Sequence, residues 1–405
     1  IQDSLVGSEM CIRDSADAVV VNTCGFLDSA KAESLNAIGE ALNENGKVIV
    51  TGCLGSTPEF ILESHPNVMT ITGPQKFNEV LDSITEHVPI KSNPFEAKPS
   101  SSYVKLTPRH YSYLKISEGC NHKCSFCIIP SLRGPLKSRS MASILSEAKS
   151  LVERGTKELL IISQDTSAYG LDLKFEETLV NGKKHKTNIY NLVNELASLG
   201  IWVRLHYIYP YPHVKQLIPL MDQNRVLPYL DVPFQHAHPD VLKRMARPSN
   251  NVHDLEQISE WRSINPDLSI RSTFIVGFPG ETESEFNFLL DWLEEAKIDR
   301  VGCFKYEDVS GARSNEMEDH LHDDIIQDRY DRFMSRAQQL SELKLKEKIG
   351  KTFTCVIDSV EQDHLICRSI FDAPEIDGIV SITKKQTHHR VGEHVTVKIK
   401  GSSEY

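Results

Sequence analysis

The stretch YSYLKISEGCNHKCSFCIIP, residues 111–130, begins as a strand-like run and continues into three closely spaced cysteines. Cys120, Cys124 and Cys127 form a C-x3-C-x2-C motif. A structural zinc site needs four ligands and disulfides need pairs, so these common uses of clustered cysteines do not explain the number three. Three thiolates on one short loop can instead bind three irons of a cubane iron-sulfur cluster and leave the fourth iron open. A zinc knuckle or a chance cluster is the alternative.

Around this motif, residues 111–335 alternate strand-like and helix-like stretches, which predicts a parallel (β/α) barrel or part of one. In such folds the functional residues lie on loops that follow the carboxyl ends of the strands. The cysteine motif follows the first strand, so we expect it at the mouth of the barrel. The predicted strands are YSYLKIS, ELLIISQD, WVRLHYIYP, LDVPFQH, SIRSTFIVGFPG and RVGCFKY.

The residues on either side of the barrel predict two smaller domains. Residues 16–88 alternate strand and helix patterns, and Cys24 and Cys53 each end a buried strand. This α/β arrangement binds ligands at the carboxyl edge of its sheet. Residues 89–110 are rich in Pro, Ser and Lys and are expected to form a linker. After a charged amphipathic helix, residues 341–405 contain short alternating strands typical of a small antiparallel β-barrel.

The composition favours a globular protein of a reducing compartment. The 405 residues are 40% hydrophobic and 25% charged, which suits two or three folded domains. Nine cysteines, an odd and clustered set, suit metal or redox chemistry better than a secreted disulfide framework. Neither a membrane-spanning apolar run nor a signal peptide is found, so we expect a soluble cytoplasmic protein. The net charge of −11 favours a basic protein partner over nucleic acid, although solubility alone also explains it.

Several motifs occur in the order and approximate spacing of one enzyme family. They are VNTCGFLDSAKAES, TGCLG, SEGCNHKCSFCIIPSLRGPLKSR, ISQDT, DVPFQHAH, GFPGET and VGCFKYEDVSGARS. With them, residues 16–405 resemble the methylthiotransferases of the radical S-adenosylmethionine (SAM) superfamily. The resemblance implies an amino-terminal cluster domain, a radical SAM partial barrel and a carboxyl-terminal β-barrel called TRAM. It also implies two 4Fe-4S clusters, with SAM cleaved to a 5′-deoxyadenosyl radical at the cluster of the C-x3-C-x2-C motif by an electron from a donor.

The auxiliary cluster of this family has three cysteine ligands, and Cys24 and Cys53 match the second and third. The first, expected in an LGCxKN motif on an earlier strand, is missing. Residues 1–15, IQDSLVGSEMCIRDS, resemble a translated sequencing adapter joined to a truncated gene. We therefore interpret residues 1–15 as non-native and Cys11 as coincidental. The auxiliary cluster is then expected to be labile or absent in this chain.

The resemblance also implies SAM contacts at the ends of barrel strands. Polar groups after the second strand bind the methionine amino group in related enzymes, although a strand-end cap explains them equally well. A side-chain amide at another strand end can bond the ribose or the substrate, and a tight glycine turn lets backbone approach adenine. The candidates are Phe126, Ser163, Gln164, Asp165, Gln235, Val276 and Gly277. His236 is expected to be a packed or solvated histidine rather than an iron ligand.

Other polar or reactive residues have simpler explanations. Three basic residues after the cysteine loop could steer a carboxylate or SAM, but solvated charge is the default: Arg133, Lys137 and Arg139. Three aromatic residues could line the barrel mouth or pack in the core: His206, Tyr207 and Tyr209. Three cysteines in strand patterns are most simply buried small hydrophobes: Cys303, Cys355 and Cys367.

The stretch CIIPSLRG resembles the branch of the family that modifies a ribosomal protein and not the transfer-RNA branch. The resemblance implies methylthio transfer to the β-carbon of an aspartate in the basic small-subunit protein S-twelve, with a contact to the ribosome or an assembly intermediate. Residues 341–405 carry ten Lys plus Arg and ten Asp plus Glu, so the terminal barrel lacks the basic excess of a domain that grips RNA. We therefore expect no stable transfer-RNA binding. A transfer-RNA methylthiotransferase and a non-catalytic iron-sulfur or RNA-binding module are the open alternatives.

Overall fold

The computed structural model describes residues 16–88, 108–180, 182–223, 225–247, 251–383 and 388–403. They form two compact units. The first combines the amino-terminal domain with residues 120–135 and 307–316, and the second contains the rest of the barrel and the carboxyl-terminal sheet. Cys11 and most of the expected linker lie outside the described residues. None of the described helices is long and apolar enough to cross a membrane.

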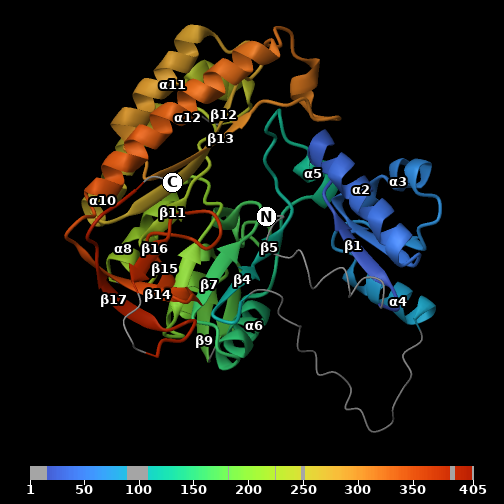
Figure 1. Cartoon of the computed structure of the whole chain (residues 1–405), viewed down its shortest axis with the longest axis horizontal. Coiled ribbons are helices and arrows are strands. Elements are labelled where there is room, and N and C mark those ends of the chain that lie inside the picture. Colours follow the sequence, from blue (N-terminus) through green and yellow to red (C-terminus); the bar gives the residue numbers. More distant parts are fainter. Residues whose placement is uncertain are drawn as a thin grey trace. The chain divides into compact units, whose positions relative to one another are not determined.

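The amino-terminal domain, which contains the labelled elements β1, α2, α3 and α4 in Figure 1, is built on a three-stranded parallel sheet in the order β1-β2-β3. Val48 and Val50 of the central strand are fully buried against Ile38 of helix α2, so apolar residues from strand and helix share one core. This confirms the predicted strand, helix and strand, whereas the short third strand and two further helices were not predicted. The elements are β1 (Val19–Thr23), α2 (Asp28–Glu44), β2 (Val48–Gly52), η1 (Cys53–Ser56), α3 (Pro58–Ser64), β3 (Thr70–Ile71) and α4 (Phe77–His87).

The barrel domain has a six-stranded sheet of parallel strands in the order β13-β12-β11-β10-β7-β4. All six strands predicted from the sequence are present. They are β4 (Tyr111–Lys115), β7 (Glu158–Ile162), β10 (Trp202–Leu205), β11 (Tyr229–Asp231), β12 (Ser269–Val276) and β13 (Arg300–Lys305). Each crossover returns through a helix, which is the connection that a parallel pair requires.

The helices bury their apolar faces against this sheet. Phe274 of β12 packs with Trp292 and Phe333 from the covering helices, which places the largest side chains between sheet and helices. The helices are α6 (Met141–Glu153), α7 (Ile189–Ala197), α8 (Ile218–Asp222), α9 (Pro239–Arg244), α10 (Asn251–Ile264), α11 (Glu283–Ala296) and α12 (Asp323–Lys346). A β-hairpin that was not predicted lies between β7 and α7, formed by β8 (Glu177–Val180) and β9 (Lys183–Lys186).

The carboxyl-terminal domain is a curled antiparallel sheet in the order β16-β15-β14-β17. Its core contains Cys355 and Cys367 beside Ile357 and Leu365, so the expectation that these two thiols are buried hydrophobes is confirmed. The four strands match the predicted ones: β14 (Thr352–Val360), β15 (His364–Ser369), β16 (Val380–Thr383) and β17 (His394–Lys398).

A buried charge network joins this sheet to the barrel within the second unit. Glu158, the first residue of β7, is fully buried. Its two carboxylate oxygens form ion pairs with the guanidinium groups of Arg204 of β10 at 2.7 Å and Arg368 of β15 at 2.8 Å. Burial alone would raise the pKa of Glu158, but the two guanidinium groups hold it below its ordinary value. A bulge in β14 turns Asp358 toward Arg368, which it bonds at 2.6 Å, and toward His110 at 2.7 Å.

Candidate active site

The three cysteines of the motif lie on a loop that is closed by its own backbone. The loop leaves a short strand, β5 (Ser117–Glu118), which pairs with β6 (Lys137–Ser138) on its return. Inside the loop the N–H of Cys120 donates to the carbonyl of Gly134 at 3.1 Å, and the N–H of Cys127 donates to the carbonyl of Cys124 at 3.2 Å. The backbone N–H of His122 points to the Cys120 sulfur at 3.4 Å, as is typical of thiolates that bind iron-sulfur clusters.

These cysteines suit an iron-sulfur cluster better than a single ion. All three are half-buried, and none belongs to a disulfide in the described part of the chain. Sulfurs around one zinc ion, each about 2.3 Å from the metal, would lie within about 4 Å of one another. The only group of three potential ligands within 4.8 Å in the described part of the chain is His238, Asp240 and Glu285. The three motif cysteines do not form such a group in that part of the chain.

The cysteine loop packs inside the first unit, together with the amino-terminal domain. Ile128, next to Cys127, joins an apolar cluster with Phe26 and Leu27, which follow Cys24. The side chain of Gln75 donates to the carbonyl of Arg133 at 2.8 Å, and helix α5 (Ile129–Arg133) contacts η1, which contains Cys53. The two sets of cysteines therefore belong to one packed body.

Residues 307–316, which follow the last barrel strand, complete this packing. Val309 and Ala312 join the same apolar cluster, and the N–H of Ser314 donates to the carbonyl of Ser125 at 2.9 Å. Arg313 also bonds the carbonyl of Lys123. Two segments that are distant in the sequence thus hold the cysteine loop.

Cys24 and Cys53 lie side by side at the carboxyl edge of the amino-terminal sheet. They follow Thr23 and Gly52, which are register partners of the parallel strands β1 and β2. A Cβ on Gly25 would lie 2.9 Å from the Leu54 nitrogen, so only glycine lets these two segments approach. Cys24 is exposed and Cys53 is buried. The two cysteines thus follow paired residues at one sheet edge, and Cys11 lies outside the described residues.

The end of β7 combines a structural cap with an unpartnered amide. Asp165 caps the short helix η2 (Thr166–Ala168), accepting the N–H of Ala168 at 3.2 Å, and it also accepts the hydroxyl of Tyr211 at 3.0 Å. The Ser163 hydroxyl is 3.2 Å from that of Thr166. Gln164 has a buried side-chain oxygen with no hydrogen-bond partner in the described structure, so it is the group left for a ligand.

Three neighbouring strands end in left-handed backbone conformations. Tyr207 after β10, Gln235 after β11 and Gly277 after β12 have φ values of 57°, 71° and 78°. Such conformations are unfavourable for side-chain-bearing residues and concentrate at functional sites. His236 is fully buried, and burial lowers its pKa to about 3, so the ring is neutral. The strained backbone at Tyr207 and Gln235 makes this sheet edge a candidate ligand site.

The remaining candidate residues differ in burial and in their contacts with other protein groups. Arg139 donates to the Lys115 carbonyl and to Glu147, both at 2.6 Å, so it supports the loop base and is not free for a ligand. Lys137 and Tyr207 are exposed, and Phe126, Arg133 and Cys303 are half-buried. His206 is buried beside Asp231, and Tyr209 packs against Arg247.

Two buried charged residues beside this sheet edge were not among the candidates from the sequence. Glu281 accepts the backbone N–H of Gly277, and Arg329 of α12 holds Glu281. The GFPGE motif contains Glu281, so an acid placed directly after a glycine turn was an available signal. Arg329 lies among many charges of an amphipathic helix, and nothing in the sequence distinguishes it.

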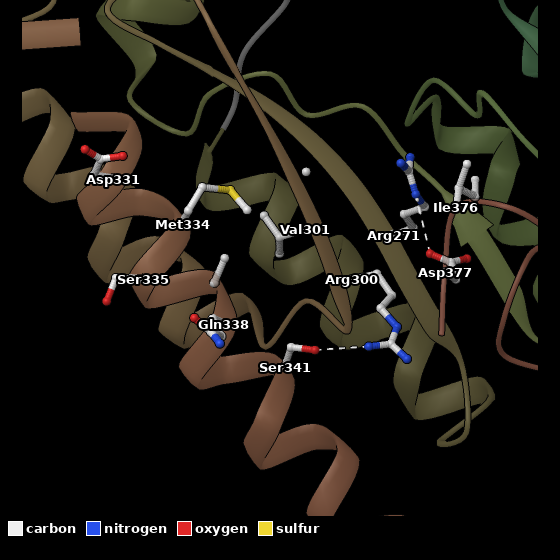
Figure 2. A pocket seen from close by; sticks show the side chains of 12 residues that line it. Arg271, Arg300, Val301, Asp331, Met334, Ser335, Gln338, Ser341, Ile376 and Asp377 are labelled. Atoms are coloured by element: carbon white, nitrogen blue, oxygen red, sulfur yellow. Dashed lines mark hydrogen bonds and ion pairs between the residues drawn. The ribbon is translucent and has the colours of Figure 1, made fainter. Parts of the chain in front are cut away.

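A cavity of 510 Å³ lies elsewhere in the second unit, between α12 and the amino-terminal parts of β12 and β13 (Figure 2). Its arginines are occupied by protein groups. Arg300 donates to Ser341 and to Asp372, each at 3.1 Å, and Arg271 pairs with Asp377 at 3.6 Å. Since ligands of parallel barrels bind at the carboxyl ends of the strands, this cavity is not part of the candidate site.

Sequence profiles of three families match the chain. They are the radical SAM superfamily over residues 114–293, the TRAM domain over residues 349–405 and the uncharacterized protein family UPF0004 over residues 6–73. Among solved structures, the radical SAM methyltransferase TsrM from Kitasatospora setae, with cobalamin and a [4Fe-4S] cluster bound, gives a TM-score of 0.54. Its sequence identity is 13%, over 73% of this chain and 65% of that chain, so the likeness concerns the fold alone.

Curated relatives are much closer in sequence. The chain is 58% identical over 392 residues to the ribosomal protein uS12 methylthiotransferase RimO of Roseobacter denitrificans, covering 97% of this chain and 84% of the relative. It is 58% identical to the protein of that name from Paracoccus denitrificans, over 96% and 84% of the two chains. The protein of that name from Cronobacter sakazakii is 55% identical, over 97% of this chain and 89% of the relative. The chain belongs to the ribosomal protein uS12 methylthiotransferase RimO family of radical SAM enzymes.

Proposed function

We propose that this chain transfers a methylthio group to the β-carbon of an aspartate of ribosomal protein uS12. The observation that carries the proposal is the packing of both cysteine sets into one compact unit, through Phe26 and Ile128. Methylthio transfer needs a carried sulfur close to the group that generates the radical, and this packing supports such proximity. Membership of the family agrees with this chemistry.

Radical SAM methylthiotransferases bind SAM and two 4Fe-4S clusters. We assign the radical SAM cluster to Cys120, Cys124 and Cys127, and the auxiliary cluster to Cys24 and Cys53 with a further ligand. When bound, the first cluster supplies the electron that cleaves SAM. The His122 N–H, which donates to the Cys120 sulfur, and the buried flanks of the loop would hold the thiolates in place and keep water away.

The side chains and turns at the strand ends would orient SAM. The Gln164 oxygen is available for a donor such as the methionine amino group, because it has no partner in the described structure. The left-handed turn at Gly277 is buried and packs Ile326 where a Cβ would lie, so we propose that the adenine ring approaches the backbone of this turn from its other side. The full set proposed to contact SAM is Phe126, Ser163, Gln164, Gln235, Val276 and Gly277.

The partners follow from charge and family. The net charge of −11 suits a basic ribosomal protein as substrate. TRAM domains bind RNA, so we propose a contact with the ribosome or an assembly intermediate, without stable transfer-RNA binding because residues 341–405 are neutral. The enzyme also needs an electron donor, and a cytoplasmic location agrees with these partners.

Anaerobic reconstitution of the protein with iron and sulfide tests this proposal. With a chemical reductant, SAM and purified uS12, we expect 5′-deoxyadenosine and a methylthiolated aspartate, both measured by mass spectrometry. The substitutions C120S, C124S and C127S should each abolish 5′-deoxyadenosine, because each removes a ligand to a different iron. Cofactor cleavage that survives all three substitutions would refute the assignment of these cysteines.

A further inference from the structure

The turn after β12 is held by a carboxylate that folds back onto it. Glu281 accepts the backbone N–H of Gly277 at 2.7 Å and that of Phe278 at 3.1 Å, both through one carboxylate oxygen. It is 3% exposed, so these bonds are shielded from water. They fix the left-handed conformation of Gly277, whose φ is 78°.

Helix α12 holds that carboxylate from the other side. Arg329 donates from one guanidinium nitrogen to the other carboxylate oxygen of Glu281 at 3.1 Å and to its backbone carbonyl at 2.9 Å. Arg329 is 4% exposed, and its guanidinium lies 5.7 Å from the centre of the Phe286 ring. A buried carboxylate that lost this partner would be left with an uncompensated charge.

The same helix also packs directly on the turn. A Cβ placed on Gly277 would lie 2.7 Å from the side chain of Ile326, which precedes Arg329 by three residues and so lies on the same face of α12. Ile326 is buried. One face of α12 therefore contacts the turn twice, once by packing and once through Glu281.

We infer that Arg329 is a positioning residue for SAM, acting through Glu281 on the backbone of Gly277 and Phe278. The inference rests on the proposed binding of SAM at this turn. Arg329 itself does not touch the cofactor. Its loss would free the turn to leave the binding conformation, so the affinity for SAM falls while the chemistry of bound SAM is unchanged.

A pair of substitutions on the same helix tests the inference. Arg332 lies three residues further along α12, is 37% exposed, and bonds Glu283 and Asp328 but not Glu281. In the anaerobically reconstituted full chain we expect R329Q to raise the Kd for SAM about tenfold or more, since a buried charged bond is lost. R332Q removes the same charge from the same helix and should change the Kd less than about twofold.

Kinetics separate positioning from a general structural defect. For 5′-deoxyadenosine formation, R329Q should raise the KM for SAM and leave kcat per reconstituted cluster near the wild-type value. Iron content and the melting temperature show whether the variant is folded. Should R329Q fail to fold, R329K keeps the charge and gives the deciding measurement, with a Kd between wild type and the expected value for R329Q.

The outcomes are distinguishable. Wild-type protein that does not bind SAM refutes the proposed function. Wild-type protein that binds SAM, together with R329Q and R329K that bind it equally well, refutes the role of Arg329 and leaves the proposed function standing. Equal losses in R329Q and R332Q would also refute it, because the effect would then belong to the charge of α12.

Discussion

Cys24 and Cys53 follow register partners of two paired strands, yet Cys24 is exposed and Cys53 is buried. Replacing Cys24 therefore disturbs the protein core less. In a protein that supplies the third auxiliary ligand, we expect C24S to lose auxiliary-cluster iron and methylthio transfer while it still cleaves SAM, because the other cluster has its own ligands. Iron and sulfide analysis beside 5′-deoxyadenosine measurement checks this. The matched control is C303S, which should keep its iron, and equal iron in both variants would contradict the assignment.

The carboxyl group of the single residue Glu281 makes the stability of the protein depend on pH. Burial raises its pKa from 4.5 to about 7, against the opposing effects of Arg329 and two backbone N–H donors, while Glu285 and Cys303 also face it. The folded state therefore binds the proton more tightly than the unfolded chain. The stability from this group is fully present below about pH 4.5 and is lost as the pH rises through about 7.

Because Glu281 loses its stabilising effect as the pH rises, the wild type and the E281Q variant should differ in how their stability depends on pH. Between about pH 5.5 and pH 8, the free energy of unfolding of the wild type should fall relative to that of E281Q, by at most about 1.4 kcal/mol per pH unit. Denaturant titrations of both proteins at several pH values check the slope. A difference that stays constant over this range would show that Glu281 is already ionised in the folded protein, which contradicts the raised pKa.

At the scale of elements, the junction of the barrel with the carboxyl-terminal sheet depends on Glu158. Arg368 of β15 reaches this buried carboxylate and also bonds Asp358. We expect R368L to destabilise the protein by about 3 kcal/mol or more, because one partner of a buried ion pair is removed and the others stay behind. Arg390, exposed in the same domain, is the control, and R390L should change stability by no more than about 0.5 kcal/mol. Equal unfolding free energies for the two variants would rule out this coupling.

The strands were predictable because each carries a local signal. The apolar run ELLII in β7 fits a parallel strand buried between helices, and the alternation in SIRSTFIV of β12 fits a strand with one more deeply buried face. The hairpin β8–β9 was missed although Asn181–Gly182 is a strong turn signal, because lysines replace the apolar alternation in β9. The cysteine motifs could be found by spacing alone. Their packing with Phe26 and with residues 307–316 could not, since no local pattern records contacts between segments so distant in sequence.

At the scale of the whole molecule, charge decides between two substrates. The acidic chain and its neutral terminal domain favour a basic protein over RNA. In a strain that lacks this gene, we expect uS12 without the methylthio group and transfer RNA with its modifications unchanged. Mass spectrometry of both, with the gene restored as control, checks the expectation. Loss of a methylthio group from the RNA alone would assign the chain to the transfer-RNA branch.

Phe26 and Leu27, which follow Cys24, share one apolar cluster with Ile128 and Leu132, which follow Cys127. This cluster joins the segments that carry the two sets of cysteines. The distance between the two sets of cysteines is therefore set within one folded unit. It is fixed when that unit folds, before any substrate arrives. Selection on this spacing would then fall on a few apolar side chains that never touch a metal, and trimming one of them could uncouple SAM cleavage from sulfur transfer while both sets of ligands stay intact.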